Sequence, residues 1–242
     1  TLYGRATGSF KDPNVYAAFL IPPMIYLVGE ALSRGPGRVT LAFMGLGLMA
    51  PALLLSFSRG AWANLAVAGL LFGTFSYAYA PLGQQRLKHI ALAMVMLSFT
   101  VLLLWAAIET DAVARLFSER ASFDQSYDQG PEGRFGGQAK AWGYILEHPL
   151  GIGALQFGGI LHSEQPHNIF LSQFLNGGWI GGCLYIVIVL LTLGVGLKAA
   201  LTPSRTSRLL IVALAAFLGL VVEGFVVETD HWRTFYLVAS LV

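Results

Sequence analysis

The stretch WIGGCLYIVIVLLTLGVGL, residues 179–197, decides the fold. It carries no charged side chain, and at about 1.5 Å of rise per residue a helix of this length crosses a hydrocarbon core about 30 Å thick. The whole chain has the same character, since 55% of its 242 residues are hydrophobic, 12% are charged and its mean hydropathy is +0.64. This composition does not suit a water-soluble domain, so the sequence predicts an integral membrane protein.

Similar apolar runs recur along the chain and predict an all-α, polytopic helical bundle of about seven spans. The six full spans are expected at residues 15–32, 39–56, 61–80, 90–108, 179–197 and 209–227, and an interrupted one begins at Trp232. The chain starts without a methionine and stops within an apolar run, so we expect a fragment of a longer protein. Residues 1–242 are predicted to form a single membrane domain, with one long loop at residues 109–166 inserted between spans.

Basic residues in the short loops predict the orientation, because positively charged loops are retained in the cytoplasm. One set of turns carries seven basic residues, with Glu30 as the acid nearby. They are Arg34, Arg38, Arg86, Lys88, Lys198, Arg205 and Arg208. The opposite side carries eight Lys and Arg against eleven Asp and Glu and includes the 109–166 loop. We therefore expect the loop on the outer side. The scattered basic residues form no stripe, so no nucleic-acid partner is predicted.

The long loop is predicted to contain a short amphipathic helix at residues 138–147. Helical spacing places Ala139, Trp142 and Leu146 on one face, and the helix should end before His148-Pro149. Such a helix is expected to lie at the outer membrane surface.

Two arginines on the outer side are functional candidates, because ionisable groups near membrane depth are costly. Arg59 lies in a short turn beside Trp62, and the alternative is that it extends to the lipid headgroups. Arg134 precedes the amphipathic helix, where its charge opposes the helix dipole. An ordinary solvated loop charge is the alternative there.

His167 follows Pro166 at the start of an apolar run, a pattern that predicts the beginning of a helix. The positive end of the helix dipole would favour the neutral imidazole, which can accept a proton. The alternative is an interfacial histidine with a hydrogen bond and no chemistry. The glycines that follow are interpreted as small residues for close helix contact, and these are Gly177, Gly178, Gly181 and Gly182.

Other polar positions have less specific patterns. Residues 228–233 form a polar turn between apolar runs that is either solvated or a site for a metal. Metal-ligand types occur there and near residue 109, namely Glu228, Asp230, His231, Glu109 and Asp111, but their spacing predicts no metal site. Glu223 lies deeper and would need a partner inside the bundle. Cys183 is alone in an apolar run, where core packing is expected.

Several of these positions form a pattern that resembles the bacterial O-antigen ligase family, whose relatives include O-antigen and exopolysaccharide polymerases and some protein O-oligosaccharyltransferases. The signature is His167-Asn168, nine residues, Gly178, two residues and Gly181. Supporting segments are residues 9–14, 58–60, 133–134, 148–153 and 230–235. Members of the family are larger, so the chain would be their central and C-terminal portion.

The resemblance implies a glycosyltransferase at the periplasmic face of the bacterial inner membrane. The donor would be a glycan on polyprenyl (undecaprenyl) diphosphate, and the acceptor a hydroxyl of lipid A core, of a growing polysaccharide or of a protein. Arg59 and Arg134 would bind the diphosphate through paired hydrogen bonds, and His167 would act as the base. Further substrate contacts are assigned to Asn168, His231 and Arg233. The transfer would invert the anomeric centre without a metal or cofactor.

Other functions predict different patterns. A polymerase of the same family would share these motifs and differ in its acceptor. A transporter of the lipid-linked glycan would carry charges in both leaflets and matching broken helices in two halves. A membrane subunit without catalysis would tolerate His167→Ala and Arg59→Ala. The candidate charges gather on one side, which favours an enzyme.

Overall fold

The computed structural model describes residues 4–32, 35–81, 83–109, 114, 130–131, 133–202, 204 and 206–242. Of the residues discussed above, Arg34, Asp111, Arg205 and much of the 109–166 loop lie outside the described part. Within it the chain forms eight helices and no β-sheet. These are α1 (Pro13–Ala31), α2 (Pro36–Leu54), α3 (Arg59–Ala78), α4 (Gln84–Ile108), α6 (Arg134–Glu147), α7 (Ile169–Leu201), α8 (Ser207–Glu223) and α9 (Arg233–Leu241).

The six full spans expected from the sequence all coincide with helices. Five helices are long and apolar enough to cross a membrane, namely α1, α2, α3, α4 and α7. Helix α8 has 17 residues, which corresponds to about 26 Å, and α9 has nine. The all-helical membrane architecture is therefore confirmed, with α8 and α9 shorter than the other five.

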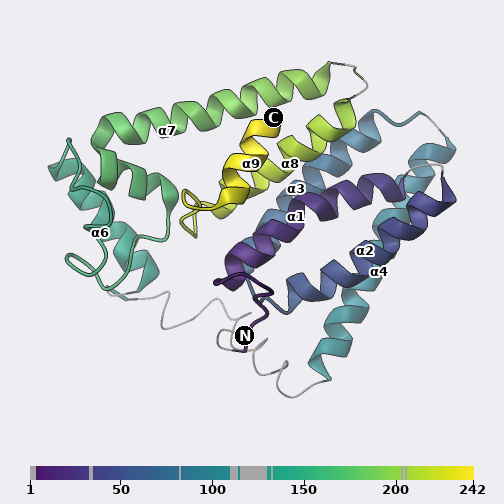
Figure 1. Cartoon of the computed structure of the whole chain (residues 1–242), viewed down its shortest axis with the longest axis horizontal. Helices are drawn as coiled ribbons and strands as arrows, with labels where there is room; N and C mark the ends of the chain where they lie inside the picture. The colour runs from purple at the N-terminus through teal and green to yellow at the C-terminus, as the bar shows by residue number, and fades with distance from the viewer. Residues whose placement is uncertain are drawn as a thin grey trace.

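Helix α8 forms the centre of the bundle. Residues 211–217 are buried without a break, as expected for a helix that is apolar on every side. Helices α1, α3, α7 and α9 pack around it, whereas α2 packs on α1 at the periphery (Figure 1). Large apolar side chains on α4 and α7, such as Met94, Ile180 and Leu191, are exposed. Because these side chains would be costly in water, the outer surface of the bundle suits lipid.

The exposed face of α7 also carries Cys183, so the expectation that this residue packs in the core is wrong. In a membrane span the core face and the lipid face are both apolar, and an apolar run alone therefore does not say which one a cysteine occupies.

Helix α7 is interrupted at Gly178, where φ is 66° and ψ is −166°. This conformation is accessible to glycine at little cost. The backbone of Pro149 and Leu150 also lies so close that a Cβ atom on Gly178 would clash with it. The interpretation of this glycine as a helix-contact residue was therefore incomplete, because it marks a break between two halves of α7. Gly182 does fit that interpretation, since it faces the ring of Phe174.

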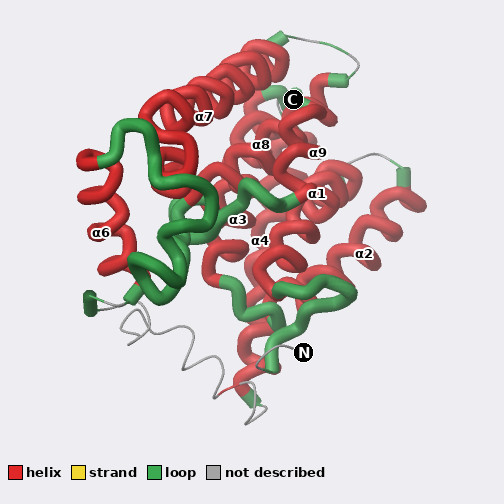
Figure 2. The backbone as a smooth tube through the Cα atoms, turned by 60° about the vertical axis from the view of Figure 1, so that its left-hand side comes forward, coloured by secondary structure: helices red, strands yellow, loops and turns green. Residues whose placement is uncertain are grey.

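Helix α6 and the loop that follows it form a cap on the first half of α7 (Figure 2). The helix begins one turn before the predicted residue 138 and ends at Glu147, as expected. Its buried face, which includes Ala141 and Ile145, packs with Phe157 and Leu175. The predicted face with Trp142 is exposed, and its location at the membrane surface remains a prediction.

The two ends of the bundle carry the two sets of polar residues that were predicted from the sequence to lie on opposite sides of the membrane. At one end, called the basic end, Arg38 and Arg208 both pair with Glu30, at 3.5 and 3.6 Å. At the other end, called the loop end, Arg5 Nε donates to the Ser56 carbonyl at 2.6 Å. The Ile169 amide donates to the Gly224 carbonyl at 2.8 Å, which brings the start of α7 to the α8–α9 turn.

Candidate active site

The candidate site lies at the loop end, where α3, α6 and α7 begin. Ser58 caps α3 by accepting from the Ala61 amide at 3.3 Å, and Gly133 is the N-cap residue of α6. Asn168 caps α7, and its Oδ1 accepts from the Phe170 amide at 3.0 Å. The amide groups in the first turn of a helix give that end a partial positive charge. This end of the bundle therefore suits anionic groups.

The two predicted arginines are the first residues of two of these helices, and the structure brings them together. Arg59 begins α3 and Arg134 begins α6, and both are partly buried. Burial and the nearby positive charge of Arg59 lower the pKa of Arg134 to about 10, while Glu164 acts in the opposite direction. With a pKa of about 10, Arg134 remains charged at neutral pH. Two adjacent cations in a partly desolvated place favour a ligand with more than one negative charge.

His167 contacts a carboxylate, that of Glu164, which also lies within electrostatic range of Arg134. Its Nε2 is 2.8 Å from Oε2 of Glu164, and its side chain is 28% exposed. The residue has a φ of 50°, a conformation that His adopts more readily than most residues. It directly precedes the capping Asn168, so the prediction that His167 lies at the positive end of a helix is confirmed.

Glu164 is the site residue that sequence reasoning missed. It lies three residues before His167 and within electrostatic range of Arg134, so it connects the predicted base to the predicted anion site. The spacing alone gives no sign of the contact, because the loop conformation determines whether the two side chains meet.

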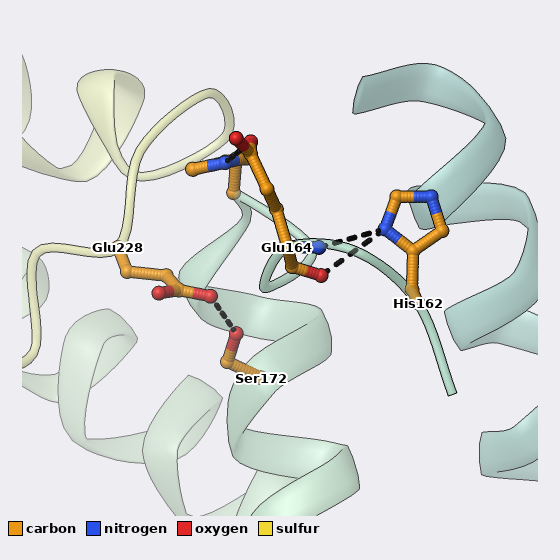
Figure 3. Close-up of polar contacts among 5 residues, drawn as sticks. His162, Glu164, Ser172 and Glu228 are labelled. Carbon is orange, nitrogen blue, oxygen red and sulfur yellow. Dashed lines mark hydrogen bonds and ion pairs between the residues drawn. The ribbon is translucent and has the colours of Figure 1, made fainter. Parts of the chain in front are cut away.

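His162 fixes the main chain of Glu164. The His162 side chain is buried and stacks on Phe157, with 5.8 Å between ring centroids. Its Nδ1 lies 3.2 Å from the Glu164 amide nitrogen and 3.1 Å from the Glu164 carbonyl oxygen. Figure 3 shows the imidazole of His162 directed at this peptide backbone. The carboxylate of Glu164 therefore extends from a backbone position that is fixed by a buried group.

The turn between α8 and α9 closes the other side of the site. The Ser172 hydroxyl donates to Glu228 Oε1 at 2.8 Å (Figure 3), and Gln173 donates to Asp230 Oδ2 at 3.2 Å. Burial raises the pKa of Glu228, whereas the Ser172 bond and the nearby His167 and His231 oppose that effect. The two histidines therefore lie near the same carboxylate.

The remaining predicted residues are less closely associated with the arginine pair and His167. His231 is exposed and lies 3.3 Å from its neighbour Asp230. Arg233 is exposed at the start of α9, and the structure does not bring it together with the other predicted residues in the described part of the chain. Asn168 uses its side-chain oxygen as a helix cap, so its amide nitrogen is the group left for a ligand.

Glycines of two sequence motifs allow α6 and the loop that follows it to pack closely on α7. The Ile152 amide donates to the Leu175 carbonyl at 2.7 Å, and the Trp179 amide donates to the Pro149 carbonyl at 2.9 Å. Gly151 and Gly178 face each other so closely that a Cβ atom on either would clash with the partner's backbone. The 148–153 segment and the break at Gly178 thus form one unit, which positions the loop that carries Glu164 and His167.

A buried polar pair lies beside the first turn of α3. Glu223 is fully buried and accepts at Oε2 from the Asn64 side-chain amide at 2.7 Å. The predicted partner for Glu223 inside the bundle is therefore present. A Cβ atom on Gly60 would lie 3.2 Å from Oε1 of Glu223, so this pair lies beside the first turn of α3, where Arg59 also lies.

Metal ligation has little support among the described residues. Within these ranges no three His, Cys, Asp or Glu side chains are grouped as a metal ion would require. The alternative that used Glu109 and Asp111 involves a residue outside the described part, namely Asp111.

Comparison with known proteins identifies a family for the chain. Residues 44–186 match the family described as O-antigen ligase, and this range includes Arg59, Arg134 and His167. No curated protein and no solved structure matches the chain. The matched range covers more than half of the sequence, and members of the family are glycosyltransferase-like ligases and polymerases. This multi-pass membrane chain belongs to the O-antigen ligase family.

Proposed function

We propose that the loop end of this chain is the active site of a membrane glycosyltransferase. The donor is a glycan linked to polyprenyl (undecaprenyl) diphosphate, and the acceptor is a sugar hydroxyl, as in the ligation of O-antigen to lipid A core. The reaction takes place at the periplasmic face of the bacterial inner membrane. The positive-inside rule supports this orientation, because the basic end then faces the cytoplasm.

One observation carries the proposal, namely that Arg59 and Glu164 both lie within electrostatic range of Arg134, and that the same Glu164 contacts His167. Two neighbouring guanidinium groups match a diphosphate, which carries several negative oxygens on adjacent phosphorus atoms. Arginine binds such oxygens through paired hydrogen bonds and keeps its charge when it is partly desolvated. Repulsion between the two arginines falls when the anion binds, so the site is better suited to the occupied state than to the empty one.

The proposed reaction is a direct displacement. The acceptor oxygen loses its proton to His167 and forms a bond to the anomeric carbon of the donor sugar. The bond from that carbon to the diphosphate oxygen breaks, and its electron pair stays on the diphosphate. Arg59 and Arg134 stabilise this leaving group as its negative charge increases. Because attack and departure take place on opposite faces, the anomeric configuration inverts. The diphosphate leaves as a stable anion, so no metal or other cofactor is needed.

The other predicted residues take supporting roles in this proposal. Asn168 presents its amide nitrogen at the start of α7, and His231 lies near Glu228. Both are proposed to contact the sugar, and the exposed Arg233 is proposed to contact donor or acceptor groups at the rim of the site. These three side chains are expected to affect affinity more than turnover.

A polymerase of the same family is the alternative, in which the acceptor is the growing polysaccharide. It uses the same donor, so the residues around the diphosphate do not distinguish it from a ligase. A non-enzymatic transporter of the same donor would have charged sites in both leaflets. At the basic end, Arg38 and Arg208 are more than half exposed and both pair with Glu30, so their charges are partly neutralised within the chain.

The test is complementation in a bacterium that lacks the enzyme, with the full-length protein. His167→Ala should reduce transfer by about 100- to 10,000-fold, the usual contribution of a general base, with normal protein abundance in the membrane. Loss of glycan on lipid A core with normal polymer length identifies a ligase, whereas short polymer identifies a polymerase. Transfer at the wild-type rate by His167→Ala would refute the assigned base. Activity of the purified enzyme should also persist in a strong chelator.

A further inference from the structure

We propose that Glu164 is a positioning residue for His167 and determines which ring nitrogen accepts the proton of the acceptor. This inference rests on the proposed function, in which His167 is the base. Glu164 has no part in the sequence signature of the site, and the contact is visible only in the folded chain.

The contact with Glu164 determines which ring nitrogen of His167 carries the proton and which can accept one. A neutral imidazole has one N–H group, which can lie on either nitrogen. Oε2 of Glu164 lies 2.8 Å from Nε2 of His167, and an ionised carboxylate can only accept a hydrogen bond. The proton of the neutral ring is therefore held on Nε2. Nδ1 keeps its lone pair and is the atom that can take the proton of an acceptor hydroxyl.

The main chain of the residue that makes this contact, Glu164, is held by a buried histidine. His162 is 6% exposed and binds the main chain of Glu164. The ring of His162 also lies against α6, because a Cβ atom on Gly137 would be 3.0 Å from its Cε1. At the other end of the segment, Asn168 is fixed as the cap of α7. The short chain between His162 and Asn168 is thus anchored at both ends, which limits the positions that Glu164 and His167 can adopt.

The charge of Glu164 also suits the reaction. When Nδ1 takes the acceptor proton, His167 becomes a cation beside a carboxylate, and the pair is stabilised by their opposite charges. The Nε2 proton stays in its hydrogen bond with Glu164 throughout, and the new proton leaves Nδ1 for solvent after the product departs. Glu164 gains and loses no proton, which separates its role from that of the base.

A simpler interpretation is an exposed ion pair without consequence. The Glu164 side chain is 58% exposed, and exposed pairs contribute little to stability. The two interpretations differ in what they predict for the ring of His167. A positioning residue controls its tautomer and the turnover of the enzyme, whereas an incidental pair affects neither.

The experiment uses the full-length protein in lipid nanodiscs with ¹⁵N-labelled histidine. The His167 signals are identified by their loss in His167→Gln. Wild type should show His167 with its proton on Nε2, and Glu164→Gln should lose that preference. Turnover at saturating donor should fall by about 10- to 100-fold in Glu164→Gln, the lower part of what a base contributes, with the donor KM changed by less than about twofold. Glu164→Asp should recover part of the turnover.

The matched control is Glu147→Gln, which removes an exposed carboxylate at the end of α6. It should leave both the tautomer and the turnover unchanged. An unchanged His167 tautomer in Glu164→Gln overturns the proposal, as does full turnover in that variant when His167→Ala is inactive. Failure of the proposed function is recognised separately, because His167→Ala would then transfer glycan at the wild-type rate whatever the tautomer shows.

Discussion

The two ends of the bundle both place arginines in the first turn of a helix, yet their surroundings differ. At the basic end, Arg38 and Arg208 are 71% and 51% exposed, and they share one carboxylate, Glu30. At the loop end, Arg59 and Arg134 are partly buried and lie within range of each other's charge. An arginine at the start of a helix therefore indicates little by itself. Burial next to a second cation is the feature that supports our proposal of an anion site at the loop end.

The same contrast extends to the histidines. At the basic end, His89 Nδ1 lies 2.8 Å from the carbonyl of Gln85, one turn earlier in its own helix. At the loop end, His167 contacts a carboxylate from a separate loop residue that is itself anchored on a buried histidine. A contact with a charged carboxylate can fix the proton of the ring and orient it for chemistry, whereas a contact with a main-chain carbonyl of the same helix only satisfies one ring nitrogen.

In the comparison between the two ends, the largest expected effect comes from removing the loop-end cations. Arg59→Ala and Arg134→Ala should each lower glycan transfer by about 100- to 1,000-fold, the cost of one preorganised group that stabilises developing charge. Arg38→Ala and Arg208→Ala, the matched controls, should change transfer by less than about twofold. Transfer is measured as product per unit of membrane-inserted protein. Equal losses at both ends would contradict the comparison.

A smaller effect is expected from the glycines at the break in α7. Gly178→Ala should destabilise the protein by about 1–3 kcal/mol from backbone strain alone, with an added cost from the clash with Pro149 and Leu150. At the neighbouring Gly177, a Cβ atom would meet nothing within 4 Å, so Gly177→Ala should change stability by less than about 0.5 kcal/mol. Thermal unfolding in detergent measures both. Wild-type stability in Gly178→Ala would show that the packing of α6 and its following loop on α7 does not depend on this break.

The positions of the spans were predictable from the sequence, because a long run of apolar residues is soluble in a bilayer and costly to expose to water. The runs ending near residues 32, 56 and 80 became α1, α2 and α3 within a few residues. Arg59, Arg134 and His167 were selected as candidates because ionisable groups are costly near the membrane and because the resemblance to the O-antigen ligase family includes the segments that carry them.

Other features required the folded chain. The break at Gly178 occurs within a continuous apolar pattern, and it is revealed only by the approach of Pro149 from another part of the chain. The Glu164–His167 contact depends on a loop that is anchored by His162 and Asn168. The face occupied by Cys183 was not predictable either, since lipid and protein core are both apolar. These features depend on how the loops and helices pack in the folded chain, which a local apolar or polar pattern does not determine.

Binding of the diphosphate carrier, which is the leaving group of the donor, tests the central claim most directly. The measurement is the Kd of undecaprenyl diphosphate for the full-length protein in nanodiscs, for wild type, Arg59→Ala, Arg134→Ala and the basic-end controls Arg38→Ala and Arg208→Ala. Loss of a charge-assisted contact should weaken binding by roughly 10- to 100-fold in each loop-end variant, with the controls equal to wild type. Wild-type affinity in Arg59→Ala and Arg134→Ala would contradict the assignment of the loop end as the diphosphate site.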